Sequence, residues 1–488
     1  MFNNVFELDL IEYAQHDGLS LGELVKRRKI TSKDLGRLFL AAVAKVNPKI
    51  NAVIEAYDDH VNALDEKIVP DGPFAGVPFL MKDIGATEKG RRQEQGSRLM
   101  KGYVANKDSF LTTRFKQAGL TLLGRTTIPE FAMANNTVSV LTGVTRNPWN
   151  LELMAGGSSG GAAASVASGI VPVAMASDGG GSIRIPASAC GVVGLKPSRG
   201  RVTAGPDFGE VWGGLLQEFV ISRSIRDTAV MLDAVSQPTL GDPFIIAQPQ
   251  RPYCKEVNAP AGKLHIAWTT ASWQPGTAVH PEVVRCVEEV ASKCEEMGHD
   301  VVEASPIFDY EGFLHALCVV LEFGFDVRID TIAGELERKL DEDTLEPVTL
   351  SYLRCARLVR VADLIRADSF LNKLRRSFGQ FFQGYDVLLT PTLAQPPEPL
   401  SKYVLTRTDL DFVAFTRLGH ETDMFLPVFN VTGQPAISLP LGQTKAGLPV
   451  GAQFIARFGE EATLIRLASA FEHATPWRDR IPPMHVSR

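Results

Sequence analysis

Short apolar runs, glycine turns and small-residue helices alternate between about residues 74 and 234. The apolar runs lie at 76–82, 120–124, 171–176 and 191–196. Runs of this length bounded by glycine are typical of buried strands, and their alternation with helical stretches predicts an α/β layer structure. The helix expected at 162–168 contains only alanine, serine and valine, so it must pack closely against its neighbours.

The first 70 residues are predicted to be mainly helical. Ser20 and Glu23 fit a capping box at the start of one helix. A second helix is expected to begin near Thr31 or Ser32, with an apolar face, and to end before Asn47-Pro48. The apolar stretch at 50–56 then predicts a strand.

Residues from about 240 to 385 differ from the rest of the chain. They are richer in charge, and their periodicity predicts long amphipathic helices at 280–298 and 350–383. This pattern suggests an inserted lobe that shapes a substrate pocket. The α/β pattern then returns, with strands expected at 385–390, 434–441 and 450–456 and a last helix at 461–474.

The parts described so far predict one domain over residues 1–488 rather than two independent ones. Its parts are a helical start at about 1–70, a core at about 71–235, the lobe at about 240–385, and a C-terminal α/β part at about 386–488. Both ends supply α/β elements, and neither end contains enough strands to close a sheet alone.

Composition excludes several classes of function. Apolar residues make up 45% and charged residues 22% of the chain, as in a soluble globular protein. The net charge of −6 is mixed along the chain, and no basic stripe suggests nucleic-acid binding. The start of the chain lacks the basic and apolar regions of a signal peptide, and no apolar run is long enough to span a bilayer. We therefore expect a cytoplasmic protein that does not bind membranes.

Cysteine and histidine give no sign of a disulfide framework or a metal. The six cysteines are scattered without a CxxC pair, so reduced and mostly buried thiols are expected. The nine histidines show no HExxH or other ligand spacing, which argues against a structural or catalytic metal.

The segment 156–186 contains the residues most suggestive of chemistry. Ser158 and Ser182 both lie in glycine-rich turns. Successive backbone N–H groups in such a turn can form a nest that binds an anion, so the turn at 179–182 is consistent with an oxyanion hole beside a nucleophile. No histidine lies between His60 and His265, but Lys82 ends an apolar strand. Burial there would lower the lysine pKa and make its free amine a base.

At this point the chain resembles the amidase signature hydrolases. The shared motifs include GVP at 76–78 with Lys82-Asp83, GGSSGG at 156–161, DGGGSIRIPAS at 178–188 and GLKPSRGRV at 194–202. Others are RSIRD at 223–227, LDA at 232–234, YDVLLTP at 385–391, NVTGQPA at 430–436 and GLPVGAQ at 447–453. The likeness covers nearly the whole chain and is weakest at about 240–380.

The resemblance implies a large mixed β-sheet covered by helices on both faces, with a variable helical lobe. It also implies a Ser–cis-Ser–Lys triad that works without a cofactor. Ser182 would be the nucleophile, and Ser158, after a non-proline cis peptide bond, would relay its proton to Lys82. The N–H groups of Gly179, Gly180, Gly181 and Ser182 would hold the tetrahedral oxyanion, and water would release the acyl-enzyme.

Two positions depart from the family pattern. Gly179 stands where threonine or isoleucine is often found, which would make the loop more flexible or narrower without removing an N–H donor. Thr127 replaces the usual asparagine before Pro129-Glu130-Phe131, with no effect that the sequence explains.

The same residues also fit other classes of site. Ser158 also fits GxSxG, but an α/β-hydrolase would need an acid and then a histidine downstream. None of the downstream histidines stands in a recognisable catalytic motif. They are His265, His280, His299, His315, His420 and His473. A phosphate-binding loop is disfavoured because no GxxxxGK[ST] occurs. Asp178 and Arg184 are expected to pair and fix the nucleophile loop. Cys318 is expected to be a packed core thiol, with substrate binding as the minority hypothesis.

The predicted function is hydrolysis of a small-molecule carboxamide, with anilides, carbamates and esters open to the same chemistry. Within the family, the sequence segments at 145–150 and 189–194 resemble those of bacterial aryl-acylamidases and of hydrolases of the 6-aminohexanoate cyclic dimer. An alternative is the amidase subunit of a tRNA-dependent glutamine amidotransferase, and a third hypothesis is an inactive scaffold. The sequence leaves the oligomeric state open, and a homodimer is one of the alternatives.

Overall fold

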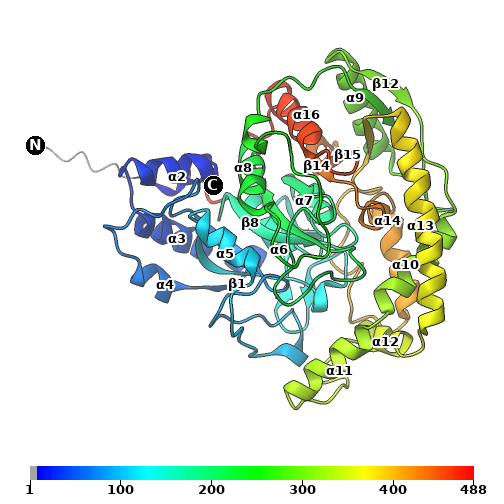
Figure 1. Cartoon of the computed structure of the whole chain (residues 1–488). Coiled ribbons are helices and arrows are strands. Elements are labelled where there is room, and N and C mark those ends of the chain that lie inside the picture. Colours follow the sequence, from blue (N-terminus) through cyan, green and yellow to red (C-terminus); the bar gives the residue numbers. More distant parts are fainter. Residues whose placement is uncertain (1–7) are drawn as a thin grey trace, which may run out of the picture.

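The computed structural model describes residues 8–488, and an eleven-stranded mixed sheet runs through its centre (Figure 1). In spatial order the strands are β1 (Val53–Ala56), β3 (Thr121–Thr126), β2 (Pro78–Lys82), β8 (Val173–Asp178), β10 (Gln217–Ser222), β9 (Val193–Lys196), β14 (Ala436–Gln443), β15 (Pro449–Ala456), β13 (Val387–Pro391), β11 (His265–Trp268) and β12 (Asp300–Glu303). This mixed α/β architecture is the one predicted from the sequence.

Strand direction changes along the sheet. β2 runs parallel to both of its neighbours, β3 and β8, and β11 runs parallel to β12 and β13. The strands between them, from β8 to β13, pair antiparallel. Every residue of β2, β3, β8 and β10 is buried, which explains why these strands appear in the sequence as nearly continuous runs of apolar and small residues.

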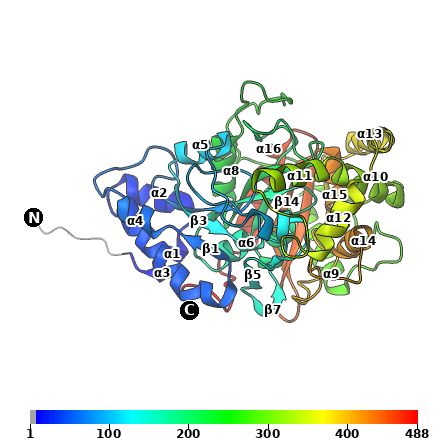
Figure 2. The same cartoon turned by 90° about the horizontal axis from the view of Figure 1, so that it is seen from below.

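The helices surround this sheet. They are α1 (Leu10–Gln15), α2 (Gly18–Lys26), α3 (Ser32–Ile50), α4 (Asp58–Ala63), α5 (Phe110–Gln117), α6 (Gly160–Ala167), α7 (Arg184–Cys190), α8 (Ile225–Val235), α9 (Pro281–Glu296), α10 (Tyr310–Glu322), α11 (Phe325–Glu335), α12 (Pro347–Ala356), α13 (Val361–Gly384), α14 (Phe412–Asp423), α15 (Pro427–Thr432) and α16 (Glu461–Ala474). Figure 2 shows α5, α8 and α16 along one side of the sheet and α3 and α9 along the other. No helix in residues 8–488 has the length and apolar character needed to cross a membrane.

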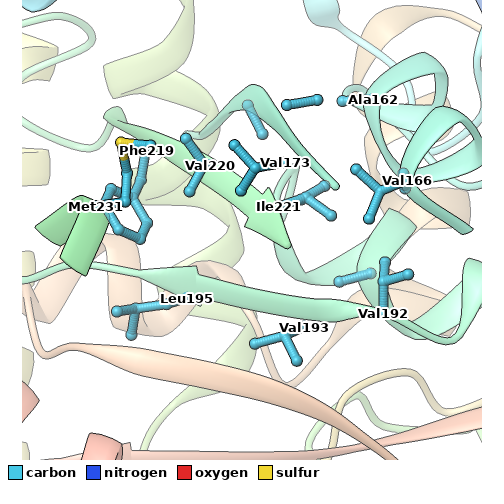
Figure 3. Close-up of a cluster of buried hydrophobic side chains, with 14 of the residues drawn as sticks. Ala162, Val166, Val173, Val192, Val193, Leu195, Phe219, Val220, Ile221 and Met231 are labelled. Atoms are coloured by element: carbon cyan, nitrogen blue, oxygen red, sulfur yellow. The ribbon is translucent and has the colours of Figure 1, made fainter. Parts of the chain in front are cut away.

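The main core lies between the central strands and helices α6 and α8 (Figure 3). Every residue of α6 is buried, as its small side chains predicted. In Figure 3, Ala162 and Val166 of α6 lie beside strands β8, β9 and β10, while Met231 of α8 lies next to Phe219. The central strands that carry the catalytic candidates are therefore held within the buried core.

Two boundary predictions near the N-terminus were wrong. The side chain of Asp17, not Ser20, caps α2 by accepting a hydrogen bond from the Ser20 N–H at 3.0 Å. Helix α3 continues through Pro48 to Ile50 and ends where Asn51 adopts a left-handed conformation with φ of 48°. Because Pro48 lies in the last turn, its missing N–H removes only one hydrogen bond of the helix. The Asn47 side chain then holds the chain that leaves the helix, because it accepts hydrogen bonds from the Ala52 and Val53 N–H groups.

The segment 240–385 also differs from its prediction. Strands β11 and β12 join it to the edge of the main sheet, so only its later part is a helical lobe. The single helix expected at 350–383 is two helices, α12 and α13, separated at 357–360. In Figure 1, α13 runs along the outer edge of this lobe. The helix at 280–298 and the C-terminal strands and helix agree with the predictions to within a few residues.

Candidate active site

Lys82 is the last residue of β2 and is 1% exposed. Its Nζ donates hydrogen bonds to Ser158 Oγ at 2.8 Å and to Ser177 Oγ at 2.9 Å. The sequence pattern at this position is only an apolar strand that ends in lysine. In the structure, the lysine amine lies between two serine hydroxyl groups. Burial of the amine disfavours its charged form, which is the condition for a lysine base.

Ser158 lies in the turn that leads into α6, and the peptide bond between Gly157 and Ser158 is cis. The serine is fully buried. The structure therefore brings Lys82 and Ser158 together, as the resemblance implies. Within residues 8–488 no histidine bonds to Ser158, which argues against the α/β-hydrolase interpretation.

Ser177 is a contact of Lys82 that the sequence analysis missed. It lies in β8, directly before Asp178, and its backbone N–H donates a hydrogen bond to Ser159 Oγ at 3.3 Å. The side chains of Ser158 and Ser177 thus fix the position of the Lys82 amine from two elements. A serine inside an apolar strand pattern was the only available signal.

The turn after β8 is held by Asp178, as predicted. Its carboxylate accepts bonds from Arg184 Nε at 2.8 Å and Nη2 at 2.9 Å, and from Asn430 Nδ2 at 2.9 Å. Arg184 is fully buried and also donates to Asn430 Oδ1 and Gln453 Oε1. Burial alone would raise the pKa of Asp178, but Arg184 and the other donors hold it at about 2. This network ties the turn to α7, α15 and β15.

Ser182 follows this turn and is half-buried at the wall of a cavity. Gly179 and Gly180 line the same cavity, and in residues 8–488 the backbone N–H groups of Gly179, Gly180 and Ser182 have no hydrogen-bond partner. The Gly181 N–H instead donates to Asp178 Oδ1 at 2.7 Å. Gly181 therefore differs from the other predicted oxyanion donors, because its N–H already has a partner in Asp178.

The hydroxyl of Ser182 is not bonded to Ser158 in the described residues. Catalytic hydrogen bonds in enzymes without substrate are often long and tighten only in the complex. Burial lowers the pKa of Lys82 to about 7, against the opposing effects of Asp178 and Glu218. A substantial fraction of Lys82 is therefore a free amine at neutral pH.

The cavity at Ser182 encloses about 780 Å³ of empty space, including the part open to solvent. Most of its wall is apolar or aromatic, and the apolar and aromatic lining residues include Met133, Trp212, Leu317, Leu321, Tyr352, Tyr403, Phe412, Phe415 and Pro427. Helices α10, α12 and α14 supply many of them. The lobe at 240–385 therefore contributes Leu317, Leu321 and Tyr352 to the pocket wall. Such a wall suits the apolar part of a small-molecule ligand.

Trp212 explains the family departure at Gly179. A Cβ added at Gly179 would lie 2.7 Å from Trp212 Cζ3, so the indole ring occupies the space that a larger side chain would need. The glycine makes room for an aromatic ring over the nucleophile turn. For Thr127 the structure shows a bond between its Oγ1 and Thr145 Oγ1 at 2.5 Å.

A polar group at the cavity wall was also missed. Asp423 Oδ2 accepts from Asn135 Nδ2 at 2.9 Å, and Asp423 Oδ1 lies 3.2 Å from His420 Nδ1. Burial raises the pKa of Asp423 to about 8 and lowers that of His420 to about 4, with Arg417 adding to the second shift. Both groups are thus uncharged at neutral pH. In the sequence, only their spacing of three residues within α14 could have indicated that the two side chains lie close together.

Cys318 is buried on α10, and burial raises its thiol pKa to about 12. Its neighbours Leu317 and Leu321 line the cavity, but Cys318 itself is not one of the lining residues. This placement agrees with the packed-thiol interpretation, and substrate contact by Cys318 stays a prediction. All six cysteines are free.

Comparisons with known proteins show the family to which the chain is similar. Residues 34–465 match the family described as Amidase. The 6-aminohexanoate-cyclic-dimer hydrolase of Paenarthrobacter ureafaciens is 35% identical over 484 residues, which are 96% of each chain. The acylamidase of Rhodococcus erythropolis is 32% identical over 477 residues, covering 94% of this chain and 95% of its own. A solved structure of 6-aminohexanoate cyclic dimer hydrolase with substrate superposes with a TM-score of 0.91 at 33% identity, covering 96% of this chain and 99% of that one.

Proposed function

The chain belongs to the amidase family of amide hydrolases, and we propose that it cleaves its substrate through an acyl-enzyme on Ser182. Ser182 Oγ attacks the amide carbonyl carbon, and its proton passes by way of Ser158 to the neutral amine of Lys82. The N–H groups of Gly179, Gly180 and Ser182 stabilise the oxyanion.

The second half of the reaction reverses the proton path. The Lys82 ammonium returns its proton through Ser158 to the leaving nitrogen, and the C–N bond breaks. Water then attacks the acyl-enzyme and gives a proton to the same relay, which restores the Ser182 hydroxyl and releases the carboxylic acid. The step consumes one water and needs no cofactor.

A single observation carries the proposal: the buried Lys82 amine donates to Ser158 Oγ at 2.8 Å, beside the turn that presents Ser182 to the cavity. A lysine with a pKa of about 7 is matched to proton transfer at neutral pH. The Asp178–Arg184 pair supports the account because it fixes the turn without contributing a competing base.

We propose small amides with an apolar acyl or amine part as the substrate class. The aromatic and aliphatic wall of the cavity favours such groups. The relatives are named for hydrolysis of a cyclic amide dimer and of acylamides, which fits this class. The amidotransferase hypothesis is not favoured, because these relatives are named for other amides.

The test is a panel of substrates with the purified protein: anilides, cyclic and linear aliphatic amides, carbamates, esters and glutamine. Hydrolysis of apolar amides with little turnover of glutamine is expected. The Ser182→Ala variant should lose this activity, whereas Ser165→Ala is the matched control, since Ser165 is buried on α6 and its hydroxyl has no partner. Activity that survives Ser182→Ala, or turnover of glutamine alone, would overturn the proposal.

A further inference from the structure

Three buried polar side chains form a row across adjacent strands at the active site. Lys82 ends β2, Ser177 lies in β8, and Glu218 lies in β10. Ser177 and Glu218 are direct cross-strand partners in the antiparallel pair, so their side chains point to the same face of the sheet. Because Lys82 Nζ bonds to Ser177 Oγ at 2.9 Å, the Glu218 carboxyl lies on the face that holds the lysine amine.

The chain is shaped to admit this carboxyl. Glu218 Oε1 accepts a hydrogen bond from the Ala86 N–H at 2.9 Å. A Cβ at Gly85 would lie only 1.8 Å from Glu218 Oε1, and Gly85 has a φ of 91°, so only glycine fits there. The loop that leaves Lys82 therefore wraps closely around the side chain of Glu218.

Glu218 forms no ion pair within residues 8–488, although it is only 8% exposed. Lys82 acts on it through a charge interaction at longer range than an ion pair. The other carboxyls near Lys82 are engaged: Asp178 pairs with Arg184 at 2.8 Å, and Asp83 pairs with Arg125 at 2.8 Å. A buried carboxylate without an ion-pair partner is costly unless it serves a neighbouring charge.

We propose that Glu218 is a positioning residue that stabilises the ammonium form of Lys82 when the proton of Ser182 reaches it. The inference rests on the proposed function of Lys82 as the base. During attack a positive charge forms on an amine that is surrounded by hydroxyls and apolar strands. The Glu218 carboxylate supplies the opposite charge at the moment when it is needed.

The electrostatics of the two groups agree with this role. Burial is the largest effect on both, lowering the pKa of Lys82 to about 7 and raising that of Glu218 to about 7. Glu218 and Asp178 raise the pKa of Lys82, while the Ala86 N–H and Lys82 lower that of Glu218. Each group therefore favours the charged form of the other. Removing the carboxyl must make Lys82 a free amine at lower pH.

The test measures how fast an alkyl phosphonofluoridate modifies the full-length enzyme as a function of pH. In this reaction Ser182 Oγ bonds to phosphorus, fluoride leaves, and the serine proton passes through Ser158 to Lys82. The readout needs no knowledge of the natural amide. Peptide mass mapping locates the adduct. If the wild-type enzyme is not modified, or is modified away from Ser182, the proposed function fails before Glu218 is tested.

With Glu218→Gln, the acid limb of the rate profile should move down by roughly one pH unit, and the plateau rate should fall several-fold. The glutamine keeps an oxygen for the Ala86 N–H, so the fold is expected to persist. Glu472→Gln is the matched control: it too accepts a backbone N–H, from Ile225 at 3.2 Å, but on α16 away from Lys82. Its profile should match the wild type.

An unshifted acid limb in folded Glu218→Gln, verified by circular dichroism, would overturn the inference. If Glu218→Gln does not fold, Glu218→Asp decides, because the shorter side chain draws the carboxylate away from the amine. A smaller downward movement of its acid limb is then expected, and an unchanged limb in that folded variant would equally reject the role of Glu218.

Discussion

At the scale of single residues, the account rests on how burial changes Lys82. A lysine in water is almost entirely protonated at neutral pH and cannot accept a proton. At the end of β2 it is 1% exposed, and the cost of burying a charge lowers its pKa to about 7. The same side chain that would be an inert cation at the surface is therefore a base at this position.

The pH dependence follows from this shift. The value of kcat/KM for an amide should rise as pH increases through about 7, because only the neutral form of Lys82 accepts the proton. Lys82→Met should lower kcat/KM by roughly 10²–10⁴-fold, and its residual activity should lose the acid limb near pH 7. Steady-state kinetics from pH 5 to 9 checks both. A methionine variant that retained the limb would show that another group titrates.

Contiguous motifs made several of these residues predictable, whereas contacts between strands were not. Lys82, Ser158 and Ser182 each stand in a short recognisable pattern. Ser177 and Glu218 become neighbours only through the register of β8 against β10, which no local pattern specifies. The exclusion of Gly181 from the oxyanion donors depends on one hydrogen bond to Asp178, which needs coordinates.

At the scale of elements, the nucleophile turn is positioned by one buried pair. Arg184 at the start of α7 joins Asp178 at the end of β8 and reaches α15 and β15. Arg184→Leu would leave the Asp178 charge buried without its partner. We expect a loss of roughly 3–5 kcal/mol in the free energy of unfolding, measured by denaturant titration.

An exposed pair provides the contrast. Arg27 and Glu23 on α2 are 68% and 49% exposed, so Arg27→Ala should change the free energy of unfolding by less than about 1 kcal/mol. If Arg27→Ala and Arg184→Leu lowered the free energy of unfolding equally, the buried Asp178–Arg184 pair would not be what holds the nucleophile turn.

Element types were easier to predict than their ends. The buried strands and α16 were visible from apolar runs and periodicity alone. The end of α3 was missed because proline in a last turn costs little when Asn51 closes the helix one turn later. The break between α12 and α13 was missed because the segment 357–360 contains neither glycine nor proline, and the apolar periodicity continues across it.

At the scale of the whole molecule, one sheet contains strands from both ends of the chain. β1 and β2 come from the first quarter of the sequence, whereas β13, β14 and β15 come from the last. Residues from the middle add β11 and β12 at the opposite edge. A sheet of this kind cannot be completed by either half alone.

We therefore propose that residues 1–488 form one folding unit. Equilibrium unfolding in guanidinium chloride should give one transition, with tryptophan fluorescence and far-ultraviolet circular dichroism coinciding. The five tryptophans include Trp273, packed on Phe425, and Trp477, so the fluorescence reports on separate parts of the fold. Two transitions at different denaturant concentrations would indicate that the lobe unfolds on its own.

The proposed mechanism requires that Ser182 carries the acyl group while Lys82 holds the proton. The most direct measurement starts with an amide or ester that the enzyme hydrolyses. The reaction is quenched in acid during turnover, and the acyl adduct is located by peptide mass spectrometry. The account predicts an added mass equal to the acyl group on Ser182, absent in Ser182→Ala and strongly reduced in Lys82→Met. An adduct on Ser158 or another residue, with Ser182 unmodified, would contradict it.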